Sequence, residues 1–371
     1  MLLRLLILLS FVSFALFSVP LPVEKLTLPK GYAIDIFATG VTNARQMARS
    51  DNGMIFVGSR GAGVLHAVID KDGDGKADEV LEIARGLNMP SGLTIKGGDL
   101  YVAQVSQIIK YPNIEQTFRN LPPAEVVIDG LPDKSHHGWK YIAFGPDGWL
   151  YLPVGAPCNI CETNGGENFD NPEFASILKY NLQTKERKWV AKGVRNSVGF
   201  DWHPQSKQMW FSDNGRDMLG DDIPPCEINR VDSEGAHYGY PYFHGGIVRD
   251  PEFGQGKDPQ DYVQPAYKLG AHVAPLGIHF YPGEMFADEA KGNLFVAEHG
   301  SWNRSKKSGY RVMMATVRDN QVTAYQPFIQ GWLNADESTW GRPVALLTLA
   351  DGSMLVSDDF ANVIYRVTYQ P

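Results

Sequence analysis

Four short segments carry side chains that could take part in chemistry. The first is the Ser-His-His-Gly of residues 135–138, which precedes an apolar run at 141–144. A histidine at the mouth of a strand can accept a proton near neutral pH without strong tuning. His137 is therefore a candidate base, and the other interpretation is a surface or structural histidine.

The second segment is Arg195-Asn196. Arginine is permanently charged and planar, so it can hold an oxyanion or polarise a carbonyl group. By itself the pair is better explained as part of an ordinary salt bridge. It opens the stretch 193–222, in which a hydrophobic strand leads into a polar turn, and loops at strand ends are where sites usually lie.

The third segment is that polar turn, residues 213–217, with Glu227 further on. Turns rich in oxygen atoms and glycine offer the ligands that Ca²⁺ selects, and a solvated acidic loop is the alternative. The fourth, residues 70–78, resembles the first half of an EF-hand loop, but its twelfth position is Leu81 rather than glutamate. It indicates either a calcium site or a turn between outer strands.

Two later phrases add arginines near apolar strands. Arg304 ends the phrase His-Gly-Ser-Trp-Asn-Arg, and Arg342 lies in Trp-Gly-Arg-Pro. With Arg195, they give three cations at strand mouths that would converge on one face of a ring of strands. Converging cations in an acidic protein indicate an anionic ligand, such as one with carboxylates.

A repeated unit supplies the elements that would position these residues. Each copy has a glycine-containing or polar turn, an apolar strand, a polar loop and a second apolar strand, whereas helical periodicity is absent beyond the first residues. The first strands of the six copies begin MIFVGS, LYVAQV, LYLPVG, MWFSDN, LFVAEH and LVSDD. The sequence therefore predicts an all-β fold, a six-bladed β-propeller, in preference to a sandwich.

Two further segments bear on the ring. The alternating residues 33–38 are expected to pair with the last unit and close the ring, which leaves no open sheet edge. The longest gap between units, from Met209 to Leu294, holds an insertion that is expected to be functional.

Composition limits the partners. The chain has 371 residues, 43% of them hydrophobic, which is enough for a large core. Its 42 acidic and 34 basic residues give a formal charge of -8. This balance argues against nucleic acid or an anionic membrane surface as the main partner.

The first 18 residues read as a secretory signal, with one early cation, a long apolar run and then small residues. An uncleaved membrane anchor is the alternative. Residues 19–371 are then expected to form a single propeller domain in the periplasm or outside the cell. No second stretch is long and apolar enough to span a bilayer.

The three cysteines allow more than one arrangement. Cys158 and Cys161 form a C-x-x-C, and Cys226 stands alone. In an oxidising compartment, a local disulfide between the first two is favoured, and a bond from one of them to Cys226 is the alternative.

The phrases GVRNSVGFDWHP, FSDNGRD, LGDDIPP, HYGYPYFHGG, HVAPLG, HGSWNRS and GRPV resemble the pyrroloquinoline-quinone-dependent sugar dehydrogenases. The sorbosone dehydrogenase branch, related to soluble glucose dehydrogenase, is the most similar. The resemblance covers nearly the whole chain after the signal. It implies a six-bladed propeller that binds pyrroloquinoline quinone (PQQ) and Ca²⁺ in a polar cleft at one face.

The resemblance also implies roles for single residues, with His137 as general base and Arg195 beside the reacting carbonyl. The remaining site residues fall into two groups. The cofactor-binding residues would be Asn196, His272, Arg304 and Arg342. The calcium ligands would be the backbone oxygens of Gly215 and Arg216 at the cofactor, and Glu227 with the Tyr238 carbonyl at a second site.

The chain departs from this pattern at three places. The aspartate that partners the catalytic histidine in glucose dehydrogenase falls at Ala156, a second cofactor-binding arginine falls at Val344, and a glutamine near the cofactor falls around Met89. Because Arg216 is assigned only through its backbone, Arg216→Ala is expected to be milder than Arg195→Ala.

The expected reaction is oxidation of a sugar hydroxyl or a sugar-derived aldehyde by hydride transfer to the quinone, followed by reoxidation by an unidentified electron acceptor. Two alternatives have a different character. One is a calcium-dependent lactone hydrolase, and the other is a carbohydrate-binding propeller without catalysis.

Overall fold

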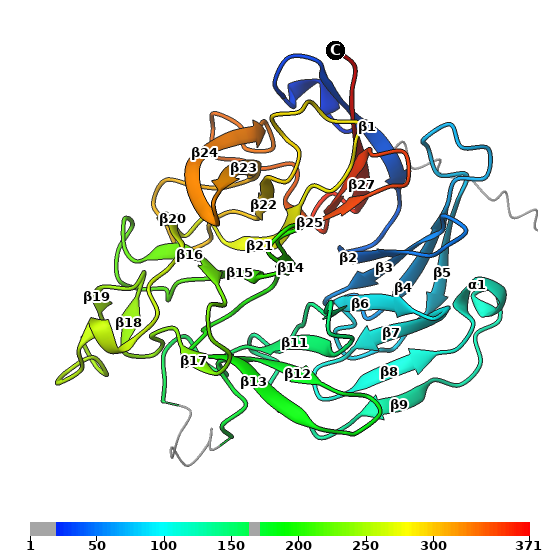
Figure 1. The fold of residues 1–371 in the computed structure, drawn as a ribbon. Coiled ribbons are helices and arrows are strands. Elements are labelled where there is room, and N and C mark those ends of the chain that lie inside the picture. Colours follow the sequence, from blue (N-terminus) through cyan, green and yellow to red (C-terminus); the bar gives the residue numbers. More distant parts are fainter. Residues whose placement is uncertain (1–19, 163–170) are drawn as a thin grey trace, which may run out of the picture.

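A computed structural model describes residues 20–162 and 171–371. The predicted signal at residues 1–18 lies outside this range. In the described part, six antiparallel sheets surround a central axis, which confirms the six-bladed β-propeller (Figure 1). We number these sheets as blades 1 to 6 in chain order.

The first three blades use consecutive strands. Blade 1 contains β2 (Ala44–Arg49), β3 (Ile55–Ser59), β4 (Leu65–Ile69) and β5 (Glu79–Ala84). Blade 2 contains β6 (Gly92–Lys96), β7 (Asp99–Ala103), β8 (Ile108–Tyr111) and β9 (Glu125–Ile128). Blade 3 contains β10 (Ala143–Phe144), β11 (Leu150–Val154), β12 (Ser176–Tyr180) and β13 (Arg187–Lys192).

The last three blades include an insertion and the closing strand. Blade 4 contains β14 (Phe200–Trp202), β15 (Met209–Asp213), β16 (Pro225–Arg230) and β20 (Tyr267–Ala271). Blade 5 contains β21 (Pro275–Phe280), β22 (Leu294–Glu298), β23 (Arg311–Arg318) and β24 (Gln321–Ile329). Blade 6 contains β25 (Pro343–Thr348), β26 (Met354–Asp358), β27 (Val363–Tyr369) and β1 (Tyr32–Thr39).

Local sequence explains why the strands turn where they do. Gly97 and Gly98 join β6 to β7, and both have positive φ values, 61° and 82°. Two such residues give the tight hairpin whose twist matches that of the flanking strands. The second strands of blades 1 and 3 to 6 are buried along their whole length. Continuous apolar runs suit a strand that is covered on both faces, so the core lies between neighbouring blades.

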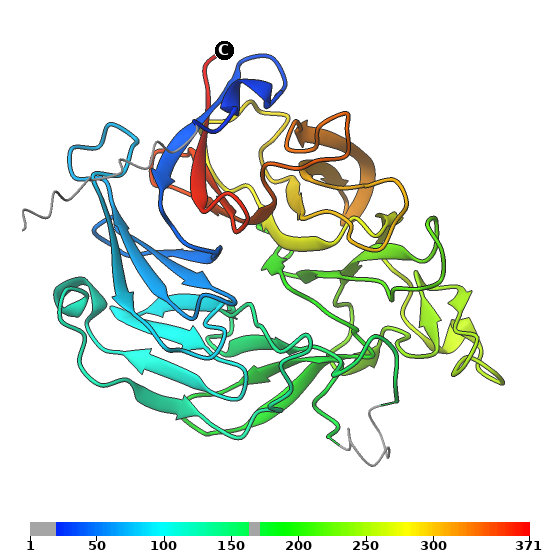
Figure 2. The same ribbon diagram turned by 180° about the vertical axis from the view of Figure 1, so that it is seen from behind.

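The ring closes as the sequence predicts. Strand β1 pairs antiparallel with β27, from Tyr32 opposite Tyr369 to Thr39 opposite Val363. Figures 1 and 2 show these two ends of the chain side by side, in blue and red. Since the pairing completes blade 6, neither strand is left with an open edge on that side.

The long insertion between β16 and β20 leaves its own blade. Its strand β17 (Ala236–His237) pairs in parallel with β13 of blade 3, and β18 (Phe243–His244) forms a separate hairpin with β19 (Val248–Arg249). The described helices are short: η1 (Val23–Lys25), α1 (Ile114–Thr117) and η2 (Pro259–Asp261). None of the helices in residues 20–162 and 171–371 is long and apolar enough to cross a bilayer.

Cys158 and Cys161 form a disulfide, and Cys226 is buried as a free thiol. The favoured local pairing is therefore confirmed.

Candidate active site

The candidate site lies at one end of the propeller. In each antiparallel blade, the start of the first strand and the end of the second strand meet at the same edge, as Ala44 does with Ser59 and Pro343 does with Asp358. Residues that precede a first strand therefore lie beside residues that follow a second strand. They line a cavity of about 580 Å³, with Arg45, Arg60, His137, Arg195, His299 and Arg342 among them.

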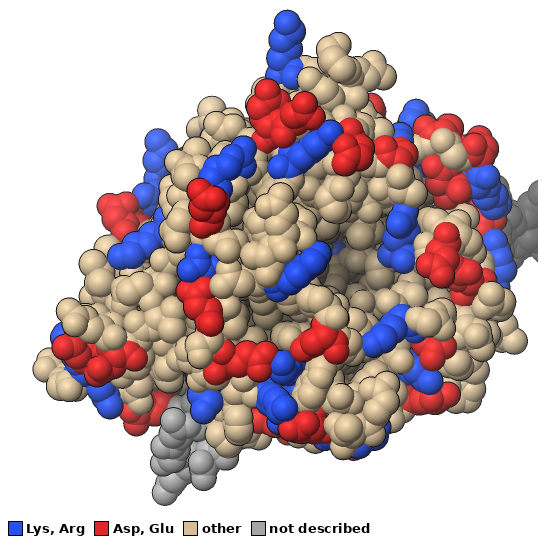
Figure 3. Space-filling view, viewed as in Figure 1, with Lys and Arg blue, Asp and Glu red and all other residues tan. Residues whose placement is uncertain are grey.

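The cavity is strongly cationic. Four guanidinium groups line it, whereas Asp217 is the one carboxylate among its described lining residues. Figure 3 shows basic and acidic side chains interspersed over one face of the ring, with a hollow near the middle. The charge imbalance is thus a local property of the cavity and not of a whole face.

Arg45 and Arg60 were not identified from the sequence. Arg45 is buried and pairs with Asp359 at 2.9 Å. The Arg60 guanidinium lies 3.8 Å from the centre of the Trp139 ring, and its pKa is lowered by burial and by the neighbouring charge of Arg45. Arg60 follows β3 as His299 follows β22, so its position in the repeat was the available signal.

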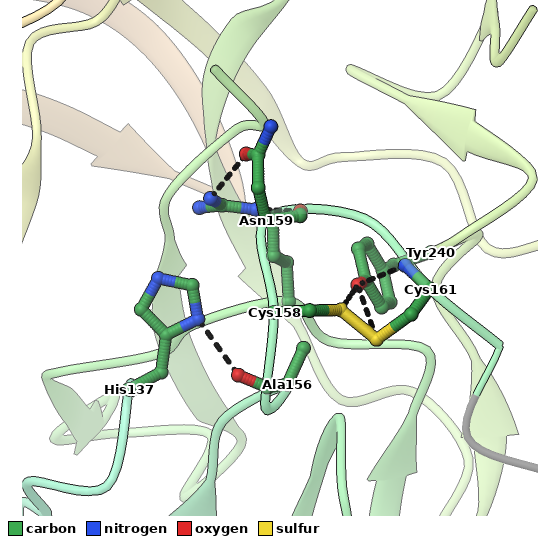
Figure 4. The surroundings of a disulfide bond; sticks show 7 residues. His137, Ala156, Cys158, Asn159, Cys161 and Tyr240 are labelled. Atoms are coloured by element: carbon green, nitrogen blue, oxygen red, sulfur yellow. Dashed lines mark hydrogen bonds between the residues drawn. A yellow bond between two sulfur atoms is a disulfide. The ribbon is translucent and has the colours of Figure 1, made fainter. Parts of the chain in front are cut away.

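His137 occupies the position expected of a base. Its Nδ1 lies 2.9 Å from the Ala156 carbonyl oxygen, as Figure 4 shows, so in the neutral ring Nδ1 donates and Nε2 is left as the proton acceptor. Burial and the charge of Arg195 hold the pKa of His137 well below its usual value. The ring is therefore neutral at pH 7, which is the form that a base requires.

The backbone carbonyl of Ala156 takes the orienting role that the missing aspartate would have. Gly155 makes this approach possible, because a Cβ atom there would lie 2.5 Å from the His137 Cβ. A carbonyl fixes the tautomer of the ring without adding a charge.

Arg195 is held from several sides. Its Nη1 donates to the Asn214 carbonyl at 3.2 Å, and Nη2 contacts the Asp217 carboxylate at 3.3 Å. Two further bonds reach Asn159, which the sequence did not mark as a site residue. The backbone at this point is fixed by Asp213, whose carboxylate accepts from Arg195 N at 2.9 Å and Asn196 N at 2.6 Å.

Asn196 lines the cavity and has a side-chain oxygen without a hydrogen-bond donor among the described residues. Its Oδ1 is buried and has no hydrogen-bond partner within the described residues. A buried polar atom without a partner costs free energy, so a ligand with a polar edge would satisfy it.

The turn after β15 presents two backbone oxygens. Neither the Gly215 nor the Arg216 carbonyl accepts a hydrogen bond from another described residue, and Gly215 lines the cavity. The Arg216 side chain points elsewhere: its guanidinium pairs with Asp250, which is fully buried and also bonds to His244 at 2.9 Å. The Arg216 side chain therefore has a structural partner of its own, in addition to the backbone oxygen expected to bind calcium.

A second, much smaller cavity of about 10 Å³ adjoins this turn and is lined by Asp213, Glu227 and Tyr238. Asp213 and Glu227 lie opposite each other on β15 and β16. Burial raises the pKa of both carboxyls, and the nearby Asp213 charge adds to the effect on Glu227. The structure thus brings the two predicted ligands together and adds Asp213 to them.

The structure separates the last two predicted cofactor-binding residues. His272 lines the cavity, and its Nε2 lies 2.8 Å from the Gly220 oxygen. Arg304 is absent from the cavity's described lining. Its guanidinium donates to the Asp221 backbone oxygen at 3.0 Å and to the Asp222 carboxylate at 2.8 Å. Arg304 therefore connects two loops. The prediction that it binds the cofactor finds no support.

The acidic loop at residues 70–78 is separate from the site. Asp70 accepts from Gly73 N and Gly75 N, and Asp78 accepts from Lys71 N. Carboxylate oxygens of Asp70, Asp72 and Asp78 gather within 4.8 Å of one another. These bonds fold the loop into a turn between β4 and β5, and calcium binding by its clustered carboxylates stays a prediction.

Comparisons with known proteins found a family model, a relative and solved structures of the same fold. A family model described as TrAA12-like matches residues 26–244 and 252–370. An uncharacterised protein of Borreliella burgdorferi is 36% identical over 376 residues, which cover 96% of this chain and 95% of that protein.

Two solved structures share the fold. The calcium structure of Trichoderma reesei family AA12 aligns with a TM-score of 0.81 at 20% identity, over 95% of this chain and 99% of that one. The holo form of the PQQ domain of pyranose dehydrogenase from Coprinopsis cinerea gives a TM-score of 0.77 at 18% identity, over 94% and 98%.

Proposed function

The chain belongs to the TrAA12-like family, and from this premise we propose that it is a PQQ- and calcium-dependent oxidoreductase of sugars or sugar-derived aldehydes. The family's solved member and the PQQ domain with the same fold carry names that point to this chemistry. Sorbosone-like aldehydes remain part of the proposed substrate class.

The observation that carries the proposal is the excess of guanidinium groups in the cavity. Arg45 has a carboxylate partner in Asp359, and Arg342 donates to two backbone oxygens, of His299 and Gly300. Among the described residues, the Arg60 guanidinium lies over the face of Trp139 and forms no ion pair. Confined cations of this kind favour an anion with several carboxylates, and planar guanidinium groups suit carboxylates well. The residues therefore fit a tricarboxylated quinone.

The oxygen ligands fit calcium. The free carbonyls of Gly215 and Arg216 would hold an ion at the cofactor, and Asp213, Glu227 and the Tyr238 carbonyl would hold a second one. Two carboxylates buried opposite each other are unfavourable without a cation, because each disfavours ionisation of the other. Hard oxygen donors of this kind are the ligands that Ca²⁺ prefers.

When bound, the quinone would accept a hydride from the substrate carbon, and calcium would withdraw charge from the quinone oxygen. His137 takes the substrate hydroxyl proton on Nε2, with Nδ1 anchored on Ala156. Arg195 would present a guanidinium N–H to the negative charge that develops on the quinone oxygen. The Asn196 carboxamide supplies a polar contact at the cavity wall.

The proposal includes export and a separate electron acceptor. A disulfide supports an oxidising compartment, as does the apolar run in residues 1–18. The lactone hydrolase would need a central cation gripped by carboxylate and asparagine side chains from several blades. Asp217 is the one carboxylate in the cavity's described lining, which favours the oxidoreductase.

Reconstitution tests the proposal. Purified apoprotein would be mixed with PQQ and Ca²⁺, binding followed by absorbance, and aldoses and sugar aldehydes assayed with an artificial acceptor. Arg60→Ala should weaken quinone binding by about tenfold or more, since charge-assisted hydrogen bonds are worth about 1.5–3 kcal/mol. Arg85→Ala is the matched control, because Arg85 is exposed and pairs with Glu82 on an outer strand. No spectral change with the wild-type protein at micromolar concentration would rule the proposal out.

A further inference from the structure

A disulfide loop contacts Arg195 directly. Asn159 lies between Cys158 and Cys161, and its backbone oxygen accepts from Arg195 Nε at 2.9 Å. Its side-chain Oδ1 accepts from Arg195 Nη2 at 2.8 Å. Figure 4 shows Asn159 between the two disulfide cysteines, together with Tyr240 and His137. One residue therefore receives two of the arginine's hydrogen bonds.

The same side chain is bonded to the turn after β15. The Asp217 backbone N–H donates to Asn159 Oδ1 at 2.9 Å, and Asn159 Nδ2 donates to the Asp217 backbone oxygen at 3.1 Å. This reciprocal pair fixes the end of the turn that carries the Gly215 and Arg216 carbonyls. Asn159 thus connects the guanidinium with the two oxygens proposed to hold calcium.

The loop itself is fixed at both ends. The disulfide closes it covalently, and the buried hydroxyl of Tyr240 accepts from Cys161 N at 3.1 Å and lies 3.3 Å from Cys158 Sγ. Tyr240 lies between β17 and β18, within the long insertion that separates β16 from β20. A closed loop has fewer conformations to lose, so its asparagine can be held in place at lower entropic cost.

The donors of Arg195 show what this contact achieves. A guanidinium has five N–H groups, and Asn159, Asn214 and Asp217 engage four of them. One Nη1 N–H is left within the described part of the chain. Without the Asn159 side chain, Nη2 would keep only the Asp217 carboxylate, and the guanidinium would be free to turn toward that charge.

We infer that Asn159 is a positioning residue, which the Cys158–Cys161 disulfide and Tyr240 keep in place so that Arg195 and the 214–217 turn hold a fixed relation. The effect on catalysis rests on the proposed function, whereas the effect on the guanidinium does not.

The test measures the guanidinium first and the quinone second. In full-length apoprotein labelled with ¹⁵N-arginine, hydrogen exchange of the Arg195 guanidinium N–H groups, those on Nη2 above all, would be followed by NMR, with the signals assigned by their loss in Arg195→Lys. Exchange should be at least about tenfold faster in Asn159→Ala and in the Cys158→Ser, Cys161→Ser double variant, because local opening becomes easier. The dissociation constant for PQQ in the presence of Ca²⁺ should rise in the same variants.

Two further variants separate positioning from general loosening. Asn181→Ala removes an asparagine that also accepts from two backbone N–H groups, in the turn between β12 and β13, and should leave Arg195 exchange unchanged. Asn159→Asp keeps an acceptor for Arg195 and should keep exchange slow.

Each outcome either supports the inference or overturns it. Unchanged exchange in Asn159→Ala and in the double variant would overturn the inference, as would equal acceleration in Asn181→Ala. Faster exchange in the first two variants only, with a wild-type protein that binds no quinone, would support the inference and reject the proposed function. Thermal unfolding of every variant identifies any that fails to fold. If Asn159→Ala does, the double cysteine variant, which keeps Asn159, carries the comparison with the wild type.

Discussion

At the scale of single residues, Arg195 and Arg216 lie on the same side of blade 4 but have different partners. Arg195 turns toward the cavity and Arg216 turns away from it. Asp250 receives the Arg216 guanidinium and is 0% exposed, so it depends on Arg216 and His244 for its stability as an anion.

Arg216→Ala should therefore destabilise the protein by about 3–5 kcal/mol, the usual cost of leaving one partner of a buried ion pair alone. Arg195→Ala should mainly lower kcat and quinone affinity. Urea unfolding and steady-state kinetics separate the two effects. Arg249→Ala is the control, since the Arg249 guanidinium bonds to the backbone oxygens of Gly254 and Lys257. Equal unfolding midpoints for Arg216→Ala and Arg249→Ala would contradict this account.

The pH dependence of turnover should report the environment of His137. Because burial and Arg195 lower its pKa, the neutral base persists as the pH falls below the ordinary imidazole value of about 6.5. The acid limb of kcat/KM should therefore lie below about pH 6.5. A limb above that value, or one retained in His137→Ala, would show that another group titrates.

The candidate site residues that the sequence marked belong to recognisable phrases, such as His137 and Arg195, which line the main cavity, and Glu227, which lines the small one. The sequence did not reveal Arg45, Arg60 or Asn159. Their roles depend on which segments meet in space, and a single arginine or asparagine has no local signature. The Arg304 guanidinium lies outside the cavity's described lining. Its phrase predicts a strand mouth but not the direction of the side chain.

At the scale of elements, turns and apolar strands were predictable because their causes are local. The unit phrases correspond to β3, β7, β11, β15, β22 and β26. The path of the insertion was not predictable, since β17 joins blade 3 after the chain has built part of blade 4. That crossing is a long-range pairing with no repeat to mark it.

The closing strand offers a test of how much ring closure contributes to stability. Phe37 on β1 is 4% exposed and packs in a cluster with Val41 and Ile364. Phe37→Ala should cost about 3–5 kcal/mol in the free energy of unfolding, as buried aromatic deletions do. Asp35→Ala, at an exposed position on the same strand, should change it by no more than about 0.5 kcal/mol. Equal denaturant midpoints for the two variants would argue against closure as a source of stability.

At the scale of the whole molecule, calcium should contribute to the stability of the fold as well as to the reaction. Without a cation, Asp213 and Glu227 have raised pKa values because they are buried together. Raised carboxyl pKa values favour the folded state where the groups are protonated and disfavour it as they ionise with rising pH. Chelation should thus lower the thermal midpoint more at about pH 9 than at about pH 5.

In a Glu227→Gln variant, chelation should lower the thermal midpoint by nearly the same amount at both pH values, because one charge of the Asp213–Glu227 pair is gone. Calorimetry with and without a chelator makes the comparison. A midpoint that chelation leaves unchanged at both pH values would exclude a structural ion between β15 and β16.

The pairing of β1 with β27 also has a consequence during synthesis. Residues 32–39 leave the ribosome well before their partners at 363–369, which are made more than three hundred residues later. Until then the nascent chain carries an unpaired strand, and its last blade cannot assemble. Contacts this distant along the chain are slow to form. A translation product that ends before residue 363 would therefore expose two unpaired strand edges, β1 and β26, whose backbone groups could pair with a neighbouring polypeptide.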